Sequence, residues 1–191
     1  VLGAVEVSFG TLGEREPCCG DAAYGLGQLD YLRQIVEANV RLFAEAGVRT
    51  LVTTSPHCYD MFLNHYPQTD GFQPLHYTQY LARLLNEGRL RFDEPFQARV
   101  TFHDLGRRNS VYDPPRQVLA AIPGLELVEM PRSREDALCC GGGGGRMWVE
   151  TKAGERFADL RVREVLETGA DILVTACPHC IACLEDSLKV A

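Results

Sequence analysis

The sequence lacks a long hydrophobic run, an excess of basic charge and a signal-peptide pattern. Near the C-terminus, the longest stretch free of charged side chains is residues 172–184. It is too short to cross a bilayer, and it contains Pro178, His179 and three cysteines. We therefore expect no direct membrane span in this chain. The formal net charge of −7 argues against nucleic acid as a partner, because excess carboxylates repel a phosphate backbone.

The N-terminus has neither the basic segment nor the long apolar segment of a signal peptide. The chain begins at Val1, and residues 5–9 have the composition of a β-strand, so we expect a part of a longer protein. Apolar residues make up 46% and charged residues 24% of the 191 residues, which is typical of folded domains. This length is enough for one domain or two small ones.

Eight cysteines are the most informative feature, and they are clustered along the chain. The clusters are Cys18-Cys19, Cys139-Cys140, and Cys177, Cys180 and Cys183. A secreted disulfide scaffold is usually shorter and denser in cysteine. Clustering favours ligation of a soft metal in a reducing compartment, so we expect a cytoplasmic protein.

The chain contains one pattern twice: a Cys-Cys pair, an amphipathic helix, a short β-branched strand and a Pro-His-Cys turn. Cys19 precedes Cys58 by 39 positions, and Cys140 precedes Cys180 by 40. We interpret this as an internal duplication.

Apolar periodicity and turn residues predict the remaining elements. The predicted helices are 29–43, 77–87 and 157–165, the first ended by Gly47 and the last by Gly169; the predicted strands are 5–9, 49–54, 100–102, 125–130 and 171–175. Alternation of strands and helices indicates an α/β fold of two pseudo-symmetric halves. Each half is expected to be a mostly parallel sheet with flanking helices and with cysteine loops at the strand ends. With residues 89–99 as the join, the halves are 1–98, a degenerate repeat, and 99–191, the cluster-binding repeat.

Four cysteines of the second repeat suit an iron–sulfur cluster, which needs several thiolates that converge on a compact core. We predict Cys139, Cys140, Cys177 and Cys180 as ligands. Pro178 suits the first turn of a helix, whose positive end favours thiolates. Gly141 and Gly142 begin a run to Gly145 that lets the backbone pass close to a cofactor and donate N–H groups to it.

Other readings remain open at this point. The same four thiolates are also able to hold a structural zinc ion, and buried unliganded cysteines or a thioredoxin-like Cys-x-x-Cys pair are further alternatives. The glycine run is no nucleotide motif, because Arg146 interrupts G-x-G-x-x-G and no Gly-Lys-Ser/Thr follows. His57 and His179 occupy equivalent turns and serve either beside the ligands or as capping residues. We expect Met147 and Trp148 to pack beside the site.

The pattern Cys139-Cys140-Gly141, 35 further residues and then Cys177-Pro178-His179-Cys180 resembles the cysteine-rich CCG domain of heterodisulfide reductases. His103-Asp104, Gly106-Arg107, Ala121–Gly124 and Gly144–Trp148 resemble its longer members. The resemblance implies a 4Fe–4S cluster, noncubane in the reductases, and electron-transfer (oxidoreductase) activity toward a disulfide, quinone or flavoprotein. It also implies partner subunits or domains: a ferredoxin-like domain, a flavoprotein or a membrane cytochrome that brings the chain to the cytoplasmic face of the membrane.

The sequence departs from that family in two places. Members typically read His-Asp-Pro-Cys-Tyr-Leu-Gly-Arg, whereas this chain runs from His103-Asp104 directly to Leu105-Gly106-Arg107. Cys183 is a candidate substitute for the missing cysteine ligand. In the first repeat Ser55 stands where the second has Cys177, which leaves Cys18, Cys19 and Cys58 as weaker ligand candidates. The alternatives to a redox domain are a zinc-held assembly module and a degenerate domain without metal.

Overall fold

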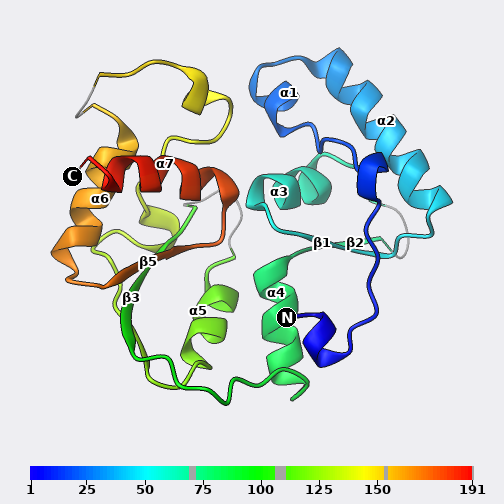
Figure 1. Ribbon diagram of the computed structural model, residues 1–191. Helices are drawn as coiled ribbons and strands as arrows, with labels where there is room; N and C mark the ends of the chain where they lie inside the picture. Colours follow the sequence, from blue (N-terminus) through cyan, green and yellow to red (C-terminus); the bar gives the residue numbers. More distant parts are fainter. Residues whose placement is uncertain (69–71, 106–110, 153–154, 191) are drawn as a thin grey trace.

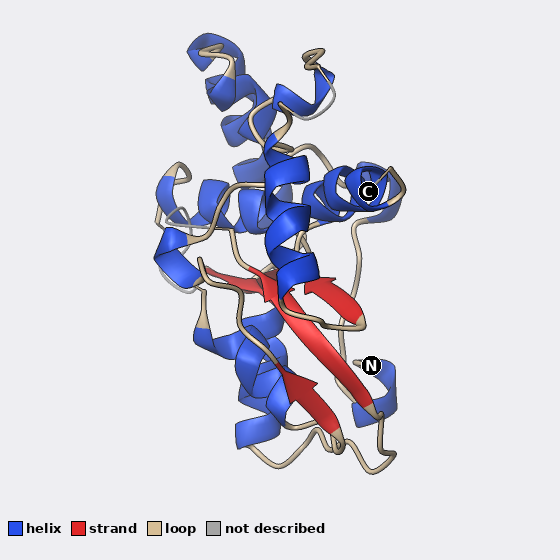
Figure 2. Cartoon of the chain, turned by 90° about the vertical axis from the view of Figure 1, so that its left-hand side faces the viewer, coloured by secondary structure: helices blue, strands red, loops and turns tan. Residues whose placement is uncertain are grey.

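Two parallel β-sheets organise the chain, and helices surround both of them. The computed structural model describes residues 1–68, 72–105, 111–152 and 155–190. The first sheet pairs β1 (Thr50–Thr53) with β2 (Gln73–His76), and the second has the order β4 (Leu125–Leu127), β3 (Ala98–His103), β5 (Ile172–Thr175). The strands lie in the middle of the molecule (Figure 2). The predicted α/β class with two similar halves is confirmed.

The helices have the following bounds: α1 Asp21–Gly25, α2 Leu29–Glu45, α3 Pro56–Asn64, α4 Tyr77–Asn86, α5 Asp113–Ala120, α6 Phe157–Glu167 and α7 Pro178–Leu188. Short 3-10 helices span Gly3–Val5, Gly13–Arg15, Arg134–Asp136 and Arg146–Trp148. In Figure 1 the first half occupies the right of the view and the second half the left. The packed helices α4 and α5 join the halves below the sheets. Among the described residues, no helix has the length and apolar character needed to cross a membrane.

The two halves correspond closely where the duplication is clearest. Residues 122 positions apart match, so that β1 corresponds to β5 and the start of α3 at Pro56 to the start of α7 at Pro178. Both α2 and α6 are followed by a glycine with φ +64°, at Gly47 and Gly169, a backbone conformation that other residues rarely adopt. The predicted helix ends are therefore confirmed.

Several sequence expectations were wrong in detail. Residues 5–9 form no strand: Gly3–Val5 is a 3-10 helix, and Phe9 is 62% exposed. In α6 the predicted apolar positions Phe157 and Leu160 are 47% and 37% exposed. The third predicted position, Val165, is buried, and the buried face also carries Ala158, Arg161, Val162 and Glu164. Because Arg161 and Glu164 are charged, the buried face of α6 does not appear in the sequence as a continuous apolar stripe.

A buried polar network fixes the Cys18-Cys19 turn of the first half. Asn39 is fully buried in α2, and its Nδ2 donates to the Cys18 carbonyl (2.9 Å) and to the Tyr66 hydroxyl (2.6 Å). Tyr66 in turn donates to the Cys19 carbonyl at 3.0 Å. The turn is thereby tied to α2 and to the end of α3.

We predict that Tyr66→Phe lowers the free energy of unfolding by about 1–2 kcal/mol, because it leaves the buried Cys19 carbonyl without its donor. Tyr31→Phe is the matched control, since Tyr31 is 60% exposed. Urea unfolding curves measure both changes. Equal stability of the two variants would contradict the structural role of this network.

Candidate metal centre

The cysteine site of the second half forms where the loop before α6 meets the first turn of α7. Cys139 and Cys140 lie in that loop, Cys177 caps α7 after β5, and Cys180 lies in its first turn. The Sγ atoms of Cys140 and Cys180 are 3.1 Å apart, and both residues are buried. The structure thus joins two segments that are 40 positions apart in the sequence. All eight cysteines lie within the described residues and are free thiols.

Contacts among the four sulfurs shift their pKa values in opposite directions. Contacts with Cys139 and Cys180 hold the pKa of Cys140 far below its usual value, while the contact with Cys140 raises the pKa of Cys139. Contacts with Cys140 and Cys177 raise the pKa of Cys180 strongly. Hydrogen bonding to Cys180, opposed by burial and assisted by His57, lowers the pKa of Cys177 to about 5. Thiolate is the form that binds metal.

Backbone N–H groups of the glycine loop point at the same sulfurs. The N–H of Gly141 donates to Cys139 Sγ at 3.3 Å, and that of Gly142 donates to Cys140 Sγ at 3.4 Å. The first half repeats this turn, where the N–H of Gly20 donates to Cys18 Sγ at 3.4 Å. Gly20 and Gly141 both have positive φ, of 93° and 81°. Vicinal cysteines followed by glycine therefore form the same sulfur-accepting turn in both halves.

At Gly142 and Gly143 the glycine run lies too close to α7 and α3 for a side chain to fit. A Cβ at Gly142 would lie 2.8 Å from Cys183 Sγ and 3.0 Å from the His179 carbonyl oxygen. A Cβ at Gly143 would lie 2.5 Å from His57 Cε1. The loop is therefore held against both halves of the molecule, as expected for residues that enclose a cofactor.

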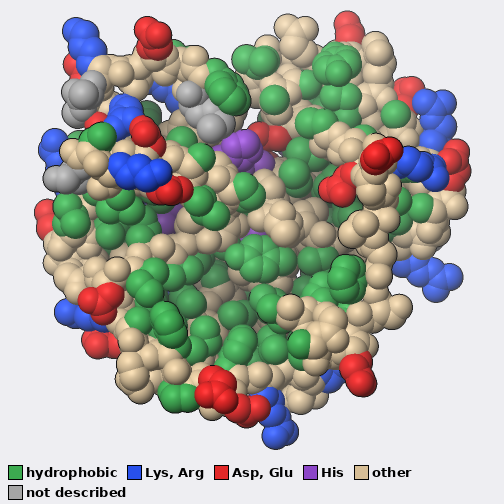
Figure 3. Space-filling model, in the orientation of Figure 1, with side chains coloured by type: hydrophobic (Ala, Val, Ile, Leu, Met, Phe, Trp, Pro, Cys, Tyr) green, Lys and Arg blue, Asp and Glu red, His purple; other side chains and the backbone are tan. Residues whose placement is uncertain are grey.

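The first half contributes a histidine to the cysteine site of the second. The rings of His57 and His179 meet edge to face with centroids 5.1 Å apart, and histidine atoms are visible where the halves meet (Figure 3). His57 Nδ1 lies 3.5 Å from Asp21 Oδ2. Burial alone would lower the pKa of His57, but Asp21 and Cys177 together raise it to about 9. A cation therefore faces the Cys177 thiolate.

The remaining candidate cysteine ligands lie in two separate places, one in each half of the chain. Cys183 packs against the buried cysteines of the second half, so it belongs to the same site. In the first half Cys19 is hydrogen-bonded to Cys58, which raises the pKa of Cys19 and lowers that of Cys58. Cys18 is exposed. This second pair is distinct from the loop at Cys140.

Sequence reasoning missed the involvement of His103 in this site. Within the described ranges, the one group of three potential metal-ligating side chains whose ligand atoms all lie within 4.8 Å of each other is His103, Cys140 and Cys180. The signals for it in the sequence were its position directly after the predicted strand 100–102 and the His103-Asp104 pair, which resembles the longer family members. Trp148 was expected beside the site but is 82% exposed, so that prediction was wrong. The Met147 side chain and Gly106-Arg107 lie outside the described residues.

The protein has two similar α/β halves, and each half has vicinal cysteines and a helix that starts with Pro-His-Cys. This is the arrangement of a protein that brings several cysteine thiolates together at one site. The chain matches the cysteine-rich domain called CCG over residues 1–63 and 100–185. It therefore belongs to the CCG cysteine-rich domain family, as the sequence resemblance predicted.

Known relatives align with nearly all of the chain. It is 42% identical over 99% of its length to the probable iron-sulfur-binding oxidoreductase FadF of Bacillus subtilis, covering 27% of that protein. It is 40% identical over its full length to the EtfAB:quinone oxidoreductase of Syntrophomonas wolfei, covering 28%. It is 36% identical over 97% of its length to one subunit of the dihydromethanophenazine:CoB–CoM heterodisulfide reductase of Methanosarcina barkeri, covering 48% of that subunit. The chain thus spans between a quarter and a half of these relatives.

We predict that Gly142→Ala destabilises the protein by about 1–3 kcal/mol, because its Cβ would overlap the Cys183 sulfur and the backbone of α7. Gly10→Ala is the control, since a Cβ there meets nothing within 4 Å. Chemical denaturation of the metal-free protein measures both. A Gly142→Ala variant as stable as Gly10→Ala would mean that the loop does not lie against α7.

We also predict that Asp21→Asn lowers the pKa of His57 from about 9, because the neighbouring carboxylate favours the charged ring. The stabilisation from this pair is complete below the unfolded histidine pKa of about 6.5 and is lost as pH rises through about 9. NMR titration of the ring protons in metal-free protein measures the shift. Asp30→Asn, on the exposed face of α2, is the control; identical titrations in both variants would exclude the Asp21 contact.

Proposed function

We propose that the chain holds an iron–sulfur cluster through Cys139, Cys140, Cys177 and Cys180 and passes electrons within a larger oxidoreductase. The observation that carries this proposal is the close approach, at 3.1 Å, of the Cys140 sulfur from a loop and the Cys180 sulfur from the first turn of α7, which are far apart in sequence. A site of four neighbouring thiols without a disulfide suits a metal cofactor better than a structural cross-link.

The residues around the sulfurs fit such a group. Gly141 and Gly142 aim backbone N–H groups at cysteine sulfurs, and hydrogen bonds of this kind tune the reduction potential of a cluster. Cys177 and Cys180 are 1% and 0% exposed, which keeps water away from the ligands. A bound cluster would supply the capacity to accept and release single electrons. The proposed cluster is of the 4Fe–4S type, in the noncubane form that the family resemblance implies.

We further propose that the two halves have different roles. Residues 99–191 would carry the cluster, while residues 1–98 would support it. The first half has Ser55 where the second has Cys177, so it has three cysteines, Cys18, Cys19 and Cys58, at the positions where the second half has four. His57 of the first half, which is paired with Asp21, nevertheless interacts with Cys177. The first half thus acts on a cluster that it does not bind.

The partners are proposed to be other domains or subunits of an electron-transfer complex in the cytoplasm. One relative is named for a quinone and another for a heterodisulfide. A disulfide, a quinone or a flavoprotein is therefore the proposed partner chemistry, reached through a ferredoxin-like domain, a flavoprotein or a membrane cytochrome. Eight free thiols are in keeping with a reducing compartment.

The deciding experiment is analysis of iron, acid-labile sulfide and zinc in protein purified without oxygen. We expect about four irons and four sulfides per chain. Cys140→Ser should lose most of this iron, because the Cys140 sulfur contacts those of both Cys139 and Cys180. Cys18→Ser is the control and should keep it, since Cys18 is an exposed cysteine of the first half that lies outside the proposed ligand set.

Two results would overturn the proposal. One zinc per chain without sulfide would identify a structural zinc module used for assembly. Unchanged iron in Cys140→Ser would place the cluster elsewhere.

A further inference from the structure

A buried histidine beside the cysteine site has one ring nitrogen without a partner. His103 ends β3 and is 1% exposed, and within the described residues its Nε2 makes no hydrogen bond. One of its ring nitrogens lies within 4.8 Å of the sulfurs of Cys140 and Cys180. A buried polar group left unpaired costs about 1–3 kcal/mol, so we expect this nitrogen to pair with one of the sulfurs that lie beside the ring.

Arg161 determines which ring nitrogen carries the proton. Its Nε donates to His103 Nδ1 at 3.1 Å. A guanidinium has only donors and stays protonated in proteins, so Nδ1 must accept. The neutral imidazole therefore keeps its hydrogen at Nε2, which is the nitrogen left to serve the sulfurs.

Arg161 is itself held rigidly. It is fully buried in α6, and it donates through Nη1 to the Arg132 carbonyl at 2.7 Å and to the Glu164 carboxylate. At the equivalent position of the first half stands Asn39, which is fully buried but neutral and ties down a backbone turn. The buried cation thus occurs in the half that carries the four-cysteine site.

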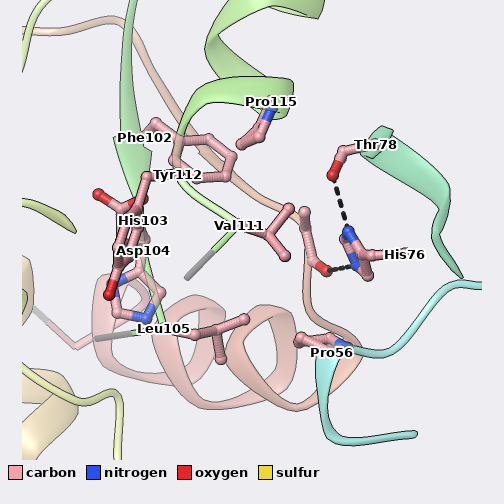
Figure 4. Close-up of a pocket in the computed structure, with 11 residues that line it drawn as sticks. Pro56, His76, Thr78, Phe102, His103, Asp104, Leu105, Val111, Tyr112 and Pro115 are labelled. Atoms are coloured by element: carbon pink, nitrogen blue, oxygen red, sulfur yellow. Dashed lines mark hydrogen bonds between the residues drawn. The ribbon is translucent and has the colours of Figure 1, made fainter. Parts of the chain in front are cut away.

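A second buried histidine, His76, differs from His103 because both of its ring nitrogens have hydrogen-bond partners. His76 ends β2 and is 2% exposed, with Nδ1 2.7 Å from Thr78 Oγ1 and Nε2 3.1 Å from the Ala176 carbonyl. Figure 4 shows both of these bonds, and it shows His76 and His103 lining the same pocket. Both nitrogens of His76 are used within the protein, whereas His103 keeps one free toward the cysteines.

We propose that His103 donates its Nε2–H to a sulfur of the cluster, either a cysteine thiolate or an inorganic sulfide, and that Arg161 positions the ring for this bond. The proposal rests on the iron–sulfur site proposed above. His103 and Arg161 are positioning residues, not ligands. An N–H···S bond stabilises the more negative, reduced state of the cluster and so raises its reduction potential.

The test compares cluster-loaded chains carrying His103→Leu, His103→Gln or His76→Gln. His103→Leu should keep the wild-type iron content but lower the equilibrium constant for reduction about tenfold, which is about 59 mV for a one-electron couple. It should also lose a proton coupling that exchanges in D₂O, observed by ENDOR spectroscopy. His103→Gln retains an N–H donor and should shift the potential less. His76→Gln controls for loss of a buried histidine as such and should leave the potential unchanged.

Arg161→Lys tests the positioning separately, because it keeps the cation and removes the Nε donor. It should shift the potential in the same direction as His103→Leu, and it keeps the proposal testable if His103→Leu fails to fold.

The proposal is overturned if His103→Leu and wild type share one potential and one exchangeable proton coupling. It is also overturned if wild type shows a directly bound nitrogen and both His103 variants lose iron, because His103 would then be a ligand. Absence of iron and sulfide from the wild-type chain, by contrast, overturns the iron–sulfur function itself, and the inference falls with it.

Discussion

The rest of the site depends on one packing constraint, which is that the backbone at Gly142 and Gly143 passes between the starts of α7 and α3. Gly142 lies against Cys183 and the His179 carbonyl on α7, and Gly143 lies against His57 on α3. No side chain larger than hydrogen fits at either place without displacing a neighbour. The same loop begins at Cys140, whose sulfur lies 3.1 Å from that of Cys180, so packing requires glycine at positions 142 and 143 before any cofactor is considered.

Charge within the site is balanced by residues from both halves. The lowered pKa values of Cys140 and Cys177 favour negative charge in a buried place, and buried negative charge needs positive groups nearby. His57 approaches it from α3, with a pKa raised to about 9, and Arg161 lies behind His103 in α6. Each cation has its own carboxylate, Asp21 and Glu164 respectively, so each is fixed in place. The buried negative charge is therefore surrounded by positive side chains that are held in fixed positions.

Local signals explain what the sequence predicted correctly. The duplication, the helix ends at Gly47 and Gly169 and the helix start at Pro178 depend on a few neighbouring residues, so they could be recognised without a structure. The face of α6 could not, because Arg161 and Glu164 occupy core positions that a hydrophobic pattern excludes. Residues 5–9 have strand-like composition, yet no described strand pairs with them. Pairing is a long-range property that composition does not contain.

The role of His103 was hidden for a similar reason. Its importance depends on a missing hydrogen bond and on an arginine 58 positions away, neither of which spacing or composition reveals. The four cysteines were identifiable because their residue type alone indicates metal chemistry. Supporting residues such as His103 and Asp21 are common amino acids whose significance arises only from where the fold places them.

The edge-to-face contact of His57 and His179 has a consequence for how the site responds to dilution. Equivalent residues touch each other where a two-fold axis relates two copies of a unit, as at the centre of a symmetric dimer interface. Here both copies belong to one polypeptide, so their association is intramolecular and has a high effective concentration. A centre built between two separate subunits would dissociate at low protein concentration. This one remains assembled even when a cell contains only a few copies of the chain.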